Sequence, residues 1–150
     1  MKQRILFLCT GNSARSQMAE ALLRLIAGDY FEAESAGTHP VGLNPLTVET
    51  MQERGVDVGD HRSKRVDEFL DQRFDYVITV CDRAKESCPI FPGPATTRHW
   101  SFEDPAAAPL ARQREIFTRV RDEIADRVCQ FLIEEAKLPP AALKCYRCGR

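Results

Sequence analysis

The chain has 150 residues, 43% of them hydrophobic, which suits a single globular domain with a core of its own. Lys and Arg number 21 against 22 Asp and Glu, so a formal net charge of -1 gives no overall attraction to nucleic acid or to an anionic membrane. No apolar run reaches the roughly 18 residues of a membrane span, and the amino end does not resemble a secretion signal. We therefore expect a cytoplasmic protein that binds neither nucleic acid nor membrane.

Three strongly patterned segments and one short strand fill the first half of the chain. Residues 3–9, QRILFLC, form the continuous apolar run of a strand buried on both faces of a parallel sheet. Residues 16–28 carry apolar side chains at helical spacing and end on glycine. Residues 30–37, YFEAESAG, predict a second strand, and residues 44–55, NPLTVETMQERG, a helix that starts on Asn and Pro. The first half therefore alternates strand and helix.

The second half continues this alternation and ends in a long helix. Residues 66–74, VDEFLDQRF, predict a short helix, and residues 75–81, DYVITVC, another buried strand. Residues 97–105, TRHWSFEDP, offer a short strand and a loop. Residues 110–137 form one amphipathic helix, which two prolines end. We place the domain at residues 1–138 and a loosely attached tail at residues 139–150.

This alternation predicts an α/β fold with a parallel sheet and helices on both of its faces. In such folds ligands bind at the carboxyl ends of the strands. Cys9 and Cys81 both fall at predicted strand ends. Six cysteines without an export signal are free, metal-bound or redox-active rather than structural disulfides, so we expect chemistry at these two positions.

The segment CTGNSARS, residues 9–16, predicts an oxyanion site. Successive backbone N–H groups in a tight loop form an anion-binding nest, and the following helix adds the positive end of its dipole. Arg15 adds a forked cation suited to a tetrahedral oxyanion, and Gly11 would permit a positive φ in the loop at low cost. The predicted substrate-binding residues are Thr10, Gly11, Asn12, Ser13, Ala14 and Arg15.

Cys9 is the predicted nucleophile of this loop. The surrounding donors should lower the pKa of its thiol into the reactive range of about 3.5 to 7.5, and Ser16 offers the sulfur a further hydrogen bond. The leaving oxygen needs a proton, for which Asp104 in FEDPAA is a candidate general acid. An Asp-Pro pair alone is typical of a turn. Because the cysteine loop is also present, we interpret Asp104 as a general acid.

Several motifs in order, reaching to about residue 137, resemble the low-molecular-weight protein tyrosine phosphatase family, and most closely its thioredoxin-coupled arsenate reductases. They are CTGNSARSQMAE, ESAGTHPVGLNP, TVCDRAKESCPIFPG, HWSFEDPA and RVRDEI. The resemblance implies one flavodoxin-like domain with a four-stranded parallel sheet flanked by helices. It also implies Cys9 as nucleophile, Arg15 and the loop amides as the oxyanion site, and Asp104 as the acid. It implies no cofactor and no metal in the reaction, and we expect a monomer.

The resemblance also implies a relay of three thiols. Cys9 forms an adduct with arsenate, Cys81 attacks the Cys9 sulfur as arsenite leaves, and Cys88 then takes over Cys81. Thioredoxin reduces the resulting Cys81 to Cys88 disulfide, a kind of exchange that requires accessible thiols. Phosphate and sulfate, which resemble arsenate in shape, are the expected competitors.

Two other classes of function remain as alternatives. A phosphatase acting through a phosphocysteine needs only Cys9, Arg15 and Asp104, but the acid loop EDPAAAP offers alanines where a phosphotyrosine ring would favour aromatic residues. A non-catalytic sensor of arsenicals or metals would use the cysteines as soft ligands. It leaves Arg15 and Asp104 without a role.

Some members of the family that this chain resembles hold a potassium ion beside the cysteine loop. The corresponding positions here include Asn12, Glu20 and Ser35, whereas two further ligand positions appear as Arg62 and Lys64. Two cations are poor ligands for potassium, so our hypothesis is that Lys64 or Arg62 supplies the positive charge directly.

The remaining cysteines and histidines carry weaker signals. Cys129 lies in the long helix and is predicted to be a small core residue. Cys145 and Cys148 form a C-x-x-C in the tail, which suits a dispensable tail, an auxiliary redox relay or intermolecular metal binding. Three histidines show no ligand spacing and are predicted to be structural or surface residues: His39, His61 and His99.

Overall fold

The sheet has four parallel strands, as predicted. The computed structural model describes residues 2–86, 88–144 and 146, so Cys145 and Cys148 of the predicted C-x-x-C lie outside the described residues. The strands are β1 (Gln3–Cys9), β2 (Phe31–Gly37), β3 (Tyr76–Thr79) and β4 (Thr96–His99). Their order is β2-β1-β3-β4, and each neighbouring pair is parallel. The α/β class is confirmed, and β1 lies in the interior of the sheet.

Four α-helices connect or flank these strands: α1 (Arg15–Ala27), α2 (Pro45–Gln52), α3 (Asp82–Glu86) and α4 (Gln113–Glu134). The Asn44 side chain caps α2 by accepting a hydrogen bond from the Leu46 N–H, which is the start that Asn-Pro predicts. Four 3-10 turns complete the described elements: η1 (Val66–Phe69), η2 (Pro105–Ala107), η3 (Leu110–Arg112) and η4 (Pro140–Ala142).

Three boundaries differ from the predictions. The helix expected over residues 66–74 is only the 3-10 turn η1, and the long helix begins at Gln113, after η3 rather than at residue 110. The helix α3, which begins at Asp82 shortly after β3 ends at Thr79, is not among the predicted elements. Its five residues show no apolar period that a sequence pattern could detect, because a single turn is too short to repeat one.

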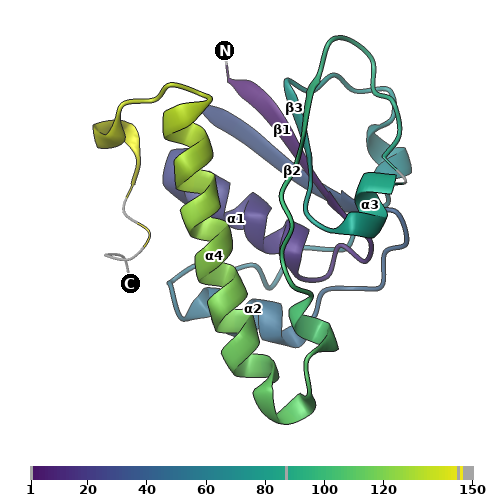
Figure 1. The fold of residues 1–150 in the computed structure, drawn as a ribbon, viewed down its shortest axis with the longest axis vertical. Helices are drawn as coiled ribbons and strands as arrows, with labels where there is room; N and C mark the ends of the chain where they lie inside the picture. Colours follow the sequence, from purple (N-terminus) through teal and green to yellow (C-terminus); the bar gives the residue numbers. More distant parts are fainter. Residues whose placement is uncertain (1, 87, 145, 147–150) are drawn as a thin grey trace.

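Apolar residues of β1 form the centre of the core. The four side chains from Ile5 to Leu8 are 0% exposed, as a strand covered on both faces requires. Helices α1 and α4 lie side by side against the sheet (Figure 1). Phe131 of α4 packs on Trp100, and Trp100 on Phe7, with ring centroids 5.8 Å apart in each pair. Burial of each large aromatic side chain contributes about 2–3 kcal/mol and fixes α4 on the sheet.

Strand register brings three strand ends to one edge of the sheet. Cys9 pairs with Gly37 and Leu8 with Thr79, so the loops that follow β1, β2 and β3 leave the sheet together. Gly37 permits the closest approach, because a Cβ there would lie 2.5 Å from the Thr10 carbonyl oxygen. The residue at this position must therefore be glycine for the loop after β1 to fold against β2.

The described part of the predicted tail packs on the domain. The Lys144 N–H donates to the Ile26 carbonyl at 2.9 Å. Tyr146 is 5% exposed, and its hydroxyl donates to Asp122 at 2.5 Å. Burial, together with this hydrogen bond, raises the pKa of Tyr146 to about 12. Among the described residues, no helix combines the length and the apolar character needed to cross a membrane.

Candidate active site

Cys9 ends β1 and is held by the first residues of the loop and of α1. Its side chain is buried, with the Ser16 hydroxyl 2.7 Å from Sγ and the Asn12 backbone N–H donating to Sγ at 3.2 Å. The predicted contact between Cys9 and Ser16 is therefore present. Both contacts orient the sulfur toward the loop and would stabilise negative charge on it.

The left-handed residue of the loop is Asn12, with φ of 48°, and not Gly11, which would have permitted a positive φ at low cost. Asparagine tolerates this region better than most residues because its short side chain bonds locally. Its Nδ2 donates to Ser16 Oγ at 2.8 Å and to Ser35 Oγ at 3.0 Å, while its Oδ1 accepts from the Lys64 N–H at 2.8 Å. Glycine would reach the same φ but could not make these contacts.

The prediction of a lowered pKa for Cys9 is wrong. Burial raises the pKa of the thiol, and the hydrogen bonds from Ser16 and Asn12 oppose this rise only in part. The nearby thiol of Cys81 adds to the rise. Sequence reasoning counted the donors around the sulfur but could not weigh the loss of water around it. The Cys9 thiol therefore holds its proton more tightly than an exposed thiol does.

Arg15 and Asp104 face each other across the loop. Arg15 Nη1 donates to the Phe102 carbonyl at 3.1 Å, and Nη2 lies 3.7 Å from Asp104 Oδ2. The other carboxylate oxygen of Asp104 accepts from the Ala106 N–H at 3.0 Å and caps η2. The Asp-Pro pair therefore makes the turn that its sequence suggests, and it also brings a carboxyl group to the predicted oxyanion site.

One cavity of about 490 Å³ joins most of the predicted site residues. Asn12 is absent from its lining because it is 0% exposed and lies behind the loop. Cys81 lines the same cavity as Cys9, and its sulfur lies 3.3 Å from Thr10 Oγ1. The lining residues are Cys9, Thr10, Gly11, Ser13, Ala14, Arg15, His39, Val41, Cys81, Asp82, Asp104 and Ala106.

Cys88 lies apart from this group. Cys88 is half-buried and lines a separate cavity of about 500 Å³. The other lining residues come from β3, β4 and residues 89–95. For Cys88, the one contact of hydrogen-bond type among the described residues is from the thiol to the Pro89 carbonyl, at 3.6 Å. Burial raises the pKa of the Cys88 thiol. The structure thus brings together two of the three predicted relay thiols.

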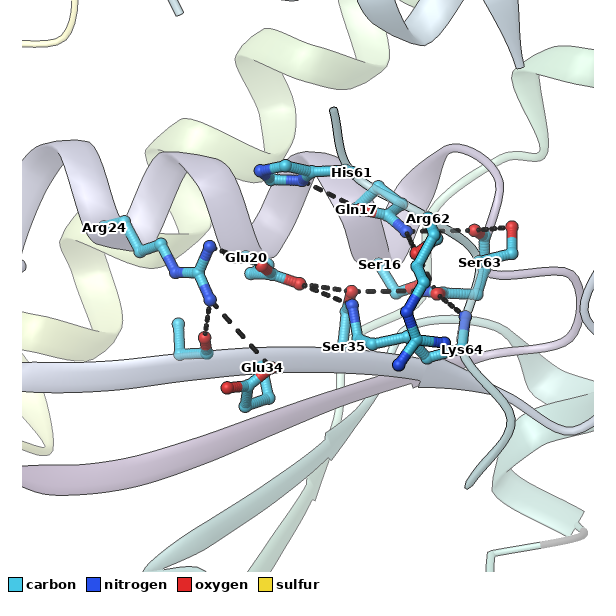
Figure 2. Close-up of polar contacts among 12 residues, drawn as sticks. Ser16, Gln17, Glu20, Arg24, Glu34, Ser35, His61, Arg62, Ser63 and Lys64 are labelled. Carbon is cyan, nitrogen blue, oxygen red and sulfur yellow. Dashed lines mark hydrogen bonds and ion pairs between the residues drawn. The ribbon is translucent and has the colours of Figure 1, made fainter. Parts of the chain in front are cut away.

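A buried carboxylate supports the loop from behind. Glu20 of α1 is 2% exposed and accepts from Ser35 Oγ at 2.5 Å (Figure 2). Arg24 Nη1 lies 2.7 Å from Glu20 Oε2, and Lys64 Nζ lies 3.4 Å from Glu20 Oε1. Arg62 instead pairs with Glu68 on the surface. Of the two cations in our hypothesis, Lys64 therefore reaches the carboxylate. An ammonium group at this carboxylate does not fit a potassium site, because potassium needs oxygen ligands there.

Sequence reasoning missed two parts of this support. Gln17 Nε2 donates to Asn12 Oδ1 at 3.0 Å and to the Arg62 carbonyl at 2.9 Å, and its Oε1 lies 3.1 Å from His61 Nδ1 (Figure 2). Ser63 Oγ donates to the Asn12 carbonyl at 2.7 Å. Gln17 reads as an ordinary helical residue, so its position in the CTGNSARSQ motif was the only available signal. Within the described part of the chain, no group of three His, Cys, Asp or Glu residues could hold a metal ion.

Comparisons with known proteins agree with this geometry. Residues 4–141 match the family described as low molecular weight phosphotyrosine protein phosphatase. Arsenate reductase 2 of Staphylococcus epidermidis is 42% identical over 130 residues, which make up 87% of this chain and 96% of that protein. A solved arsenate reductase in the phosphate binding state has a TM-score of 0.72 at 27% identity, over 91% of this chain and 99% of that chain.

A second solved structure is the thioredoxin-dependent arsenate reductase Cg_ArsC1' of Corynebacterium glutamicum. It has a TM-score of 0.69 at 32% identity, and 87% of this chain matches 60% of that chain. The family match spans the cysteine loop, the strand end at Cys81 and the Asp104 turn alike. The chain belongs to the low molecular weight phosphotyrosine protein phosphatase family.

Proposed function

We propose that this protein is an arsenate reductase in which Cys9, Cys81 and Cys88 act in turn. The observation that carries the proposal is the second thiol, Cys81, in the same cavity as Cys9. Hydrolysis of a phosphate ester needs one thiol, whereas reduction of As(V) to As(III) needs two electrons, which two thiols provide when they form a disulfide. The Staphylococcus epidermidis relative named above is an arsenate reductase, and this chain matches 96% of its length.

In the first step the Cys9 sulfur bonds to arsenic. Arsenate binds to the loop amides of residues 10–15, and Arg15 pairs with two of its oxygens. One As–O bond breaks as the S–As bond forms. The leaving arsenate oxygen already carries one proton. It receives the proton of the Cys9 thiol through Asp104, which acts as general acid, and leaves as water. The Ser16 hydroxyl, 2.7 Å from the sulfur, stabilises the thiolate while it attacks.

In the second step Cys81 attacks the Cys9 sulfur. The S–As bond breaks and its electron pair goes to arsenic, which leaves as arsenite carrying the proton of the Cys81 thiol. Cys9 and Cys81 are then joined by a disulfide, so two thiols have been oxidised and As(V) has been reduced. The Thr10 hydroxyl, 3.3 Å from the Cys81 sulfur, is placed to donate to it as it loses its proton.

In the third step Cys88 attacks Cys81 and releases Cys9. Because Cys88 lies at a different cavity, its thiol must approach Cys81 before this attack. The Cys81 to Cys88 disulfide then lies outside the oxyanion site. We propose thioredoxin as its reductant, since the Corynebacterium glutamicum relative is thioredoxin-dependent. Ile90, which is 95% exposed and two residues from Cys88, offers an apolar contact for such a partner.

Phosphoester hydrolysis through Cys9 is the second candidate function. Cys9, Arg15 and Asp104 suffice for it, and the family match supports it. Phosphate and sulfate then compete with arsenate for the same loop. We place either reaction in the cytoplasm, where thiols stay reduced, and in a monomeric domain of residues 1–138. Size-exclusion chromatography with light scattering tests the monomer.

The test follows arsenate-dependent NADPH consumption with thioredoxin and thioredoxin reductase. Wild type is compared with Cys88→Ser, with the matched control Cys129→Ser in α4, and with the double variant Cys145→Ser and Cys148→Ser. We expect Cys88→Ser to lose turnover, while the other two variants retain it. Aryl phosphate hydrolysis, which needs only Cys9, should persist in Cys88→Ser.

A different pattern would replace the proposal. If wild type consumes no NADPH with arsenate but hydrolyses an aryl phosphate through Cys9, the protein is a phosphatase. If Cys88→Ser retains full turnover, the third thiol has no part in the relay. If the double tail variant loses turnover, the C-x-x-C belongs to the relay and the domain boundary at residue 138 is functionally wrong.

A further inference from the structure

The carbonyl groups of the cysteine loop are held from outside the loop. Each carbonyl oxygen of residues 9–13 accepts at least one hydrogen bond from a residue that lies beyond the loop. The donors are the backbone N–H groups of Thr38, His39, Val41 and Asn44 and the side chains of Gln17, Thr47 and Ser63. The orientation of each peptide from Cys9 to Ser13 is therefore fixed by residues that surround the loop.

A carbonyl held in this way also orients the N–H group of the same peptide. The C=O and N–H of a trans peptide lie in one plane and point in opposite directions. The peptide between Gly11 and Asn12 shows the consequence. Its carbonyl accepts from the Val41 N–H at 3.1 Å, and its N–H donates to Cys9 Sγ at 3.2 Å. The outward carbonyl thus turns the N–H toward the sulfur, which is the side on which an oxyanion must bind.

The start of α2 holds the peptide between Ser13 and Ala14 in the same manner. The Ser13 carbonyl accepts from the Asn44 N–H at 3.0 Å and from the Thr47 hydroxyl at 2.7 Å. Asn44 is the N-cap of α2, and Thr47 lies in its first turn. Ala14 lines the cavity together with Cys9. By the same peptide geometry, the Ala14 N–H is turned toward the oxyanion site.

Thr47 itself is buried and lies behind the loop. Its side chain is 0% exposed, and none of the cavity-lining residues comes from α2. A buried hydroxyl needs a hydrogen-bond partner, and the partner here is a carbonyl of the oxyanion loop. A carbonyl oxygen has two lone pairs, so donors from Thr47 and Asn44 together restrict the tilt of the peptide more than either donor alone. Thr47 is thus placed to act on the site without touching its ligand.

Thr50 offers a matched comparison one turn further along α2. It is also 0% exposed, and its hydroxyl also donates to a carbonyl at 2.7 Å. That carbonyl belongs to Leu46 within the helix, not to the cysteine loop. Removing either hydroxyl therefore deletes a buried hydrogen bond of the same kind and length, but only Thr47 holds a peptide of the oxyanion site.

We propose that Thr47 is a positioning residue of the oxyanion site. Its hydroxyl fixes the peptide between Ser13 and Ala14 so that the Ala14 N–H donates to an oxygen of bound arsenate or phosphate. Donors that are already oriented stabilise an oxyanion better, because they need not reorganise when it binds. The proposal rests on the oxyanion binding that the proposed function requires, and it does not depend on the thiol relay.

The test uses three variants at Thr47 and Thr50→Val as the control, all in the reduced full-length protein. Thr47→Val keeps the shape of the side chain without the hydroxyl, and Thr47→Ala also avoids placing a methyl group against the Ser13 carbonyl. Thr47→Ser restores a hydroxyl. The first readout is the Kd of inorganic phosphate from isothermal titration calorimetry. The second is the arsenate concentration at half of the maximal single-turnover rate of arsenite formation. Urea denaturation measures the stability of each variant.

We expect the Kd of phosphate and the half-saturating arsenate concentration to rise about fivefold in Thr47→Val and Thr47→Ala, and to stay within about twofold of wild type in Thr47→Ser. Thr50→Val should lose a similar amount of stability but bind phosphate as wild type does. Unchanged phosphate affinity in both Thr47→Val and Thr47→Ala, or an equal loss of affinity in Thr50→Val, would overturn the proposal and leave Thr47 as a residue that only stabilises α2.

The same measurements separate this proposal from the proposed function. If wild type binds phosphate but forms no arsenite, the thiol relay fails, and the phosphate affinities still decide the role of Thr47. If wild type binds no phosphate, the cysteine loop is not an oxyanion site, and the role of Thr47 is refuted with it.

Discussion

The loop around Cys9 and the segment around Cys88 are held in opposite ways. Behind Cys9, a chain of short contacts runs through Ser16, Asn12 and Ser35 to the buried carboxylate of Glu20. Around Cys88, the described contacts are a 3.6 Å approach to the neighbouring Pro89 carbonyl and apolar packing against the core, beside an open cavity. One thiol is therefore fixed by hydrogen bonds from several elements, and the other mainly by apolar packing.

The difference matches the two kinds of chemistry in the proposed reaction. Stabilising an oxyanion requires donors that do not reorganise when charge develops, so a rigid loop is favoured. Passing a disulfide outward to a reductant requires a thiol that can move, so a loosely held segment is favoured. The predictions below test whether rigidity at Cys9 and freedom at Cys88 are real properties of this chain.

The largest expected effect is that of Arg15→Lys. Lysine keeps the charge but loses the forked guanidinium, and with it the contacts to the oxyanion and to the Phe102 carbonyl. We expect single-turnover arsenite formation to fall by about 10²–10³-fold. The matched control is Arg62→Lys on the surface, which should stay near wild type. Equal activity in both variants would remove Arg15 from the oxyanion site.

Gly37→Ala tests the close approach of the loop to β2. The new Cβ would meet the Thr10 carbonyl at 2.5 Å and the Asn12 nitrogen at 2.9 Å, and both are backbone atoms that cannot move aside alone. We expect the free energy of unfolding to fall by about 3 kcal/mol, measured by urea denaturation. Gly59→Ala, whose nearest contact is a flexible Asp57 oxygen at 3.2 Å, serves as control. A stable Gly37→Ala protein would mean that the loop is not held rigidly.

Lys64→Met tests the cation behind the loop. The substitution leaves Glu20 buried with Arg24 as its remaining cationic partner, so we expect a loss of about 2 kcal/mol in unfolding free energy. Arg62→Met, which breaks only an exposed pair with Glu68, should leave the unfolding free energy close to that of wild type. Wild-type stability should not respond to potassium more than to sodium. A steep rise with potassium alone would refute the role of Lys64.

Thiol reactivity gives the smallest expected difference. Burial raises the pKa of both Cys9 and Cys88, so alkylation of each should keep rising with pH beyond the range of an ordinary thiol. Because Cys9 is only 3% exposed, we expect Cys88 to react about tenfold faster at pH 7.5. Time-resolved peptide mass spectrometry measures both rates, and phosphate should slow only Cys9. Faster alkylation of Cys9 would reverse the comparison.

The same raised pKa gives the sign of a pH effect on stability. A folded state that holds the Cys9 proton more tightly than the unfolded chain is stabilised at pH values below the unfolded thiol pKa. This contribution is lost as the pH rises through the folded value. A Cys9→Ser variant should therefore lack this part of the decline in stability at alkaline pH.

Local patterns were enough to predict most of the fold. The apolar run of β1, the helical spacing of α1 and the Asn-Pro start of α2 each depend on neighbouring residues alone, and each is present. The short elements could not be placed in this way: α3 and η1 are single turns whose form depends on what they pack against. The docking of α4 on the sheet likewise depends on an aromatic contact between residues far apart in the sequence, Tyr76 of β3 and Phe131 of α4.

The sequence by itself determined that a thiol and a guanidinium lie on one loop at a strand end, because five residues separate Cys9 from Arg15. Only the tertiary structure decided that Asn12 rather than Gly11 takes the left-handed position, since the partners of Asn12 come from β2 and residues 63–64. It also decided that Cys81 shares the cavity of Cys9 while Cys88 does not. Burial and long-range contacts are sums over the whole fold, and no local spacing contains them.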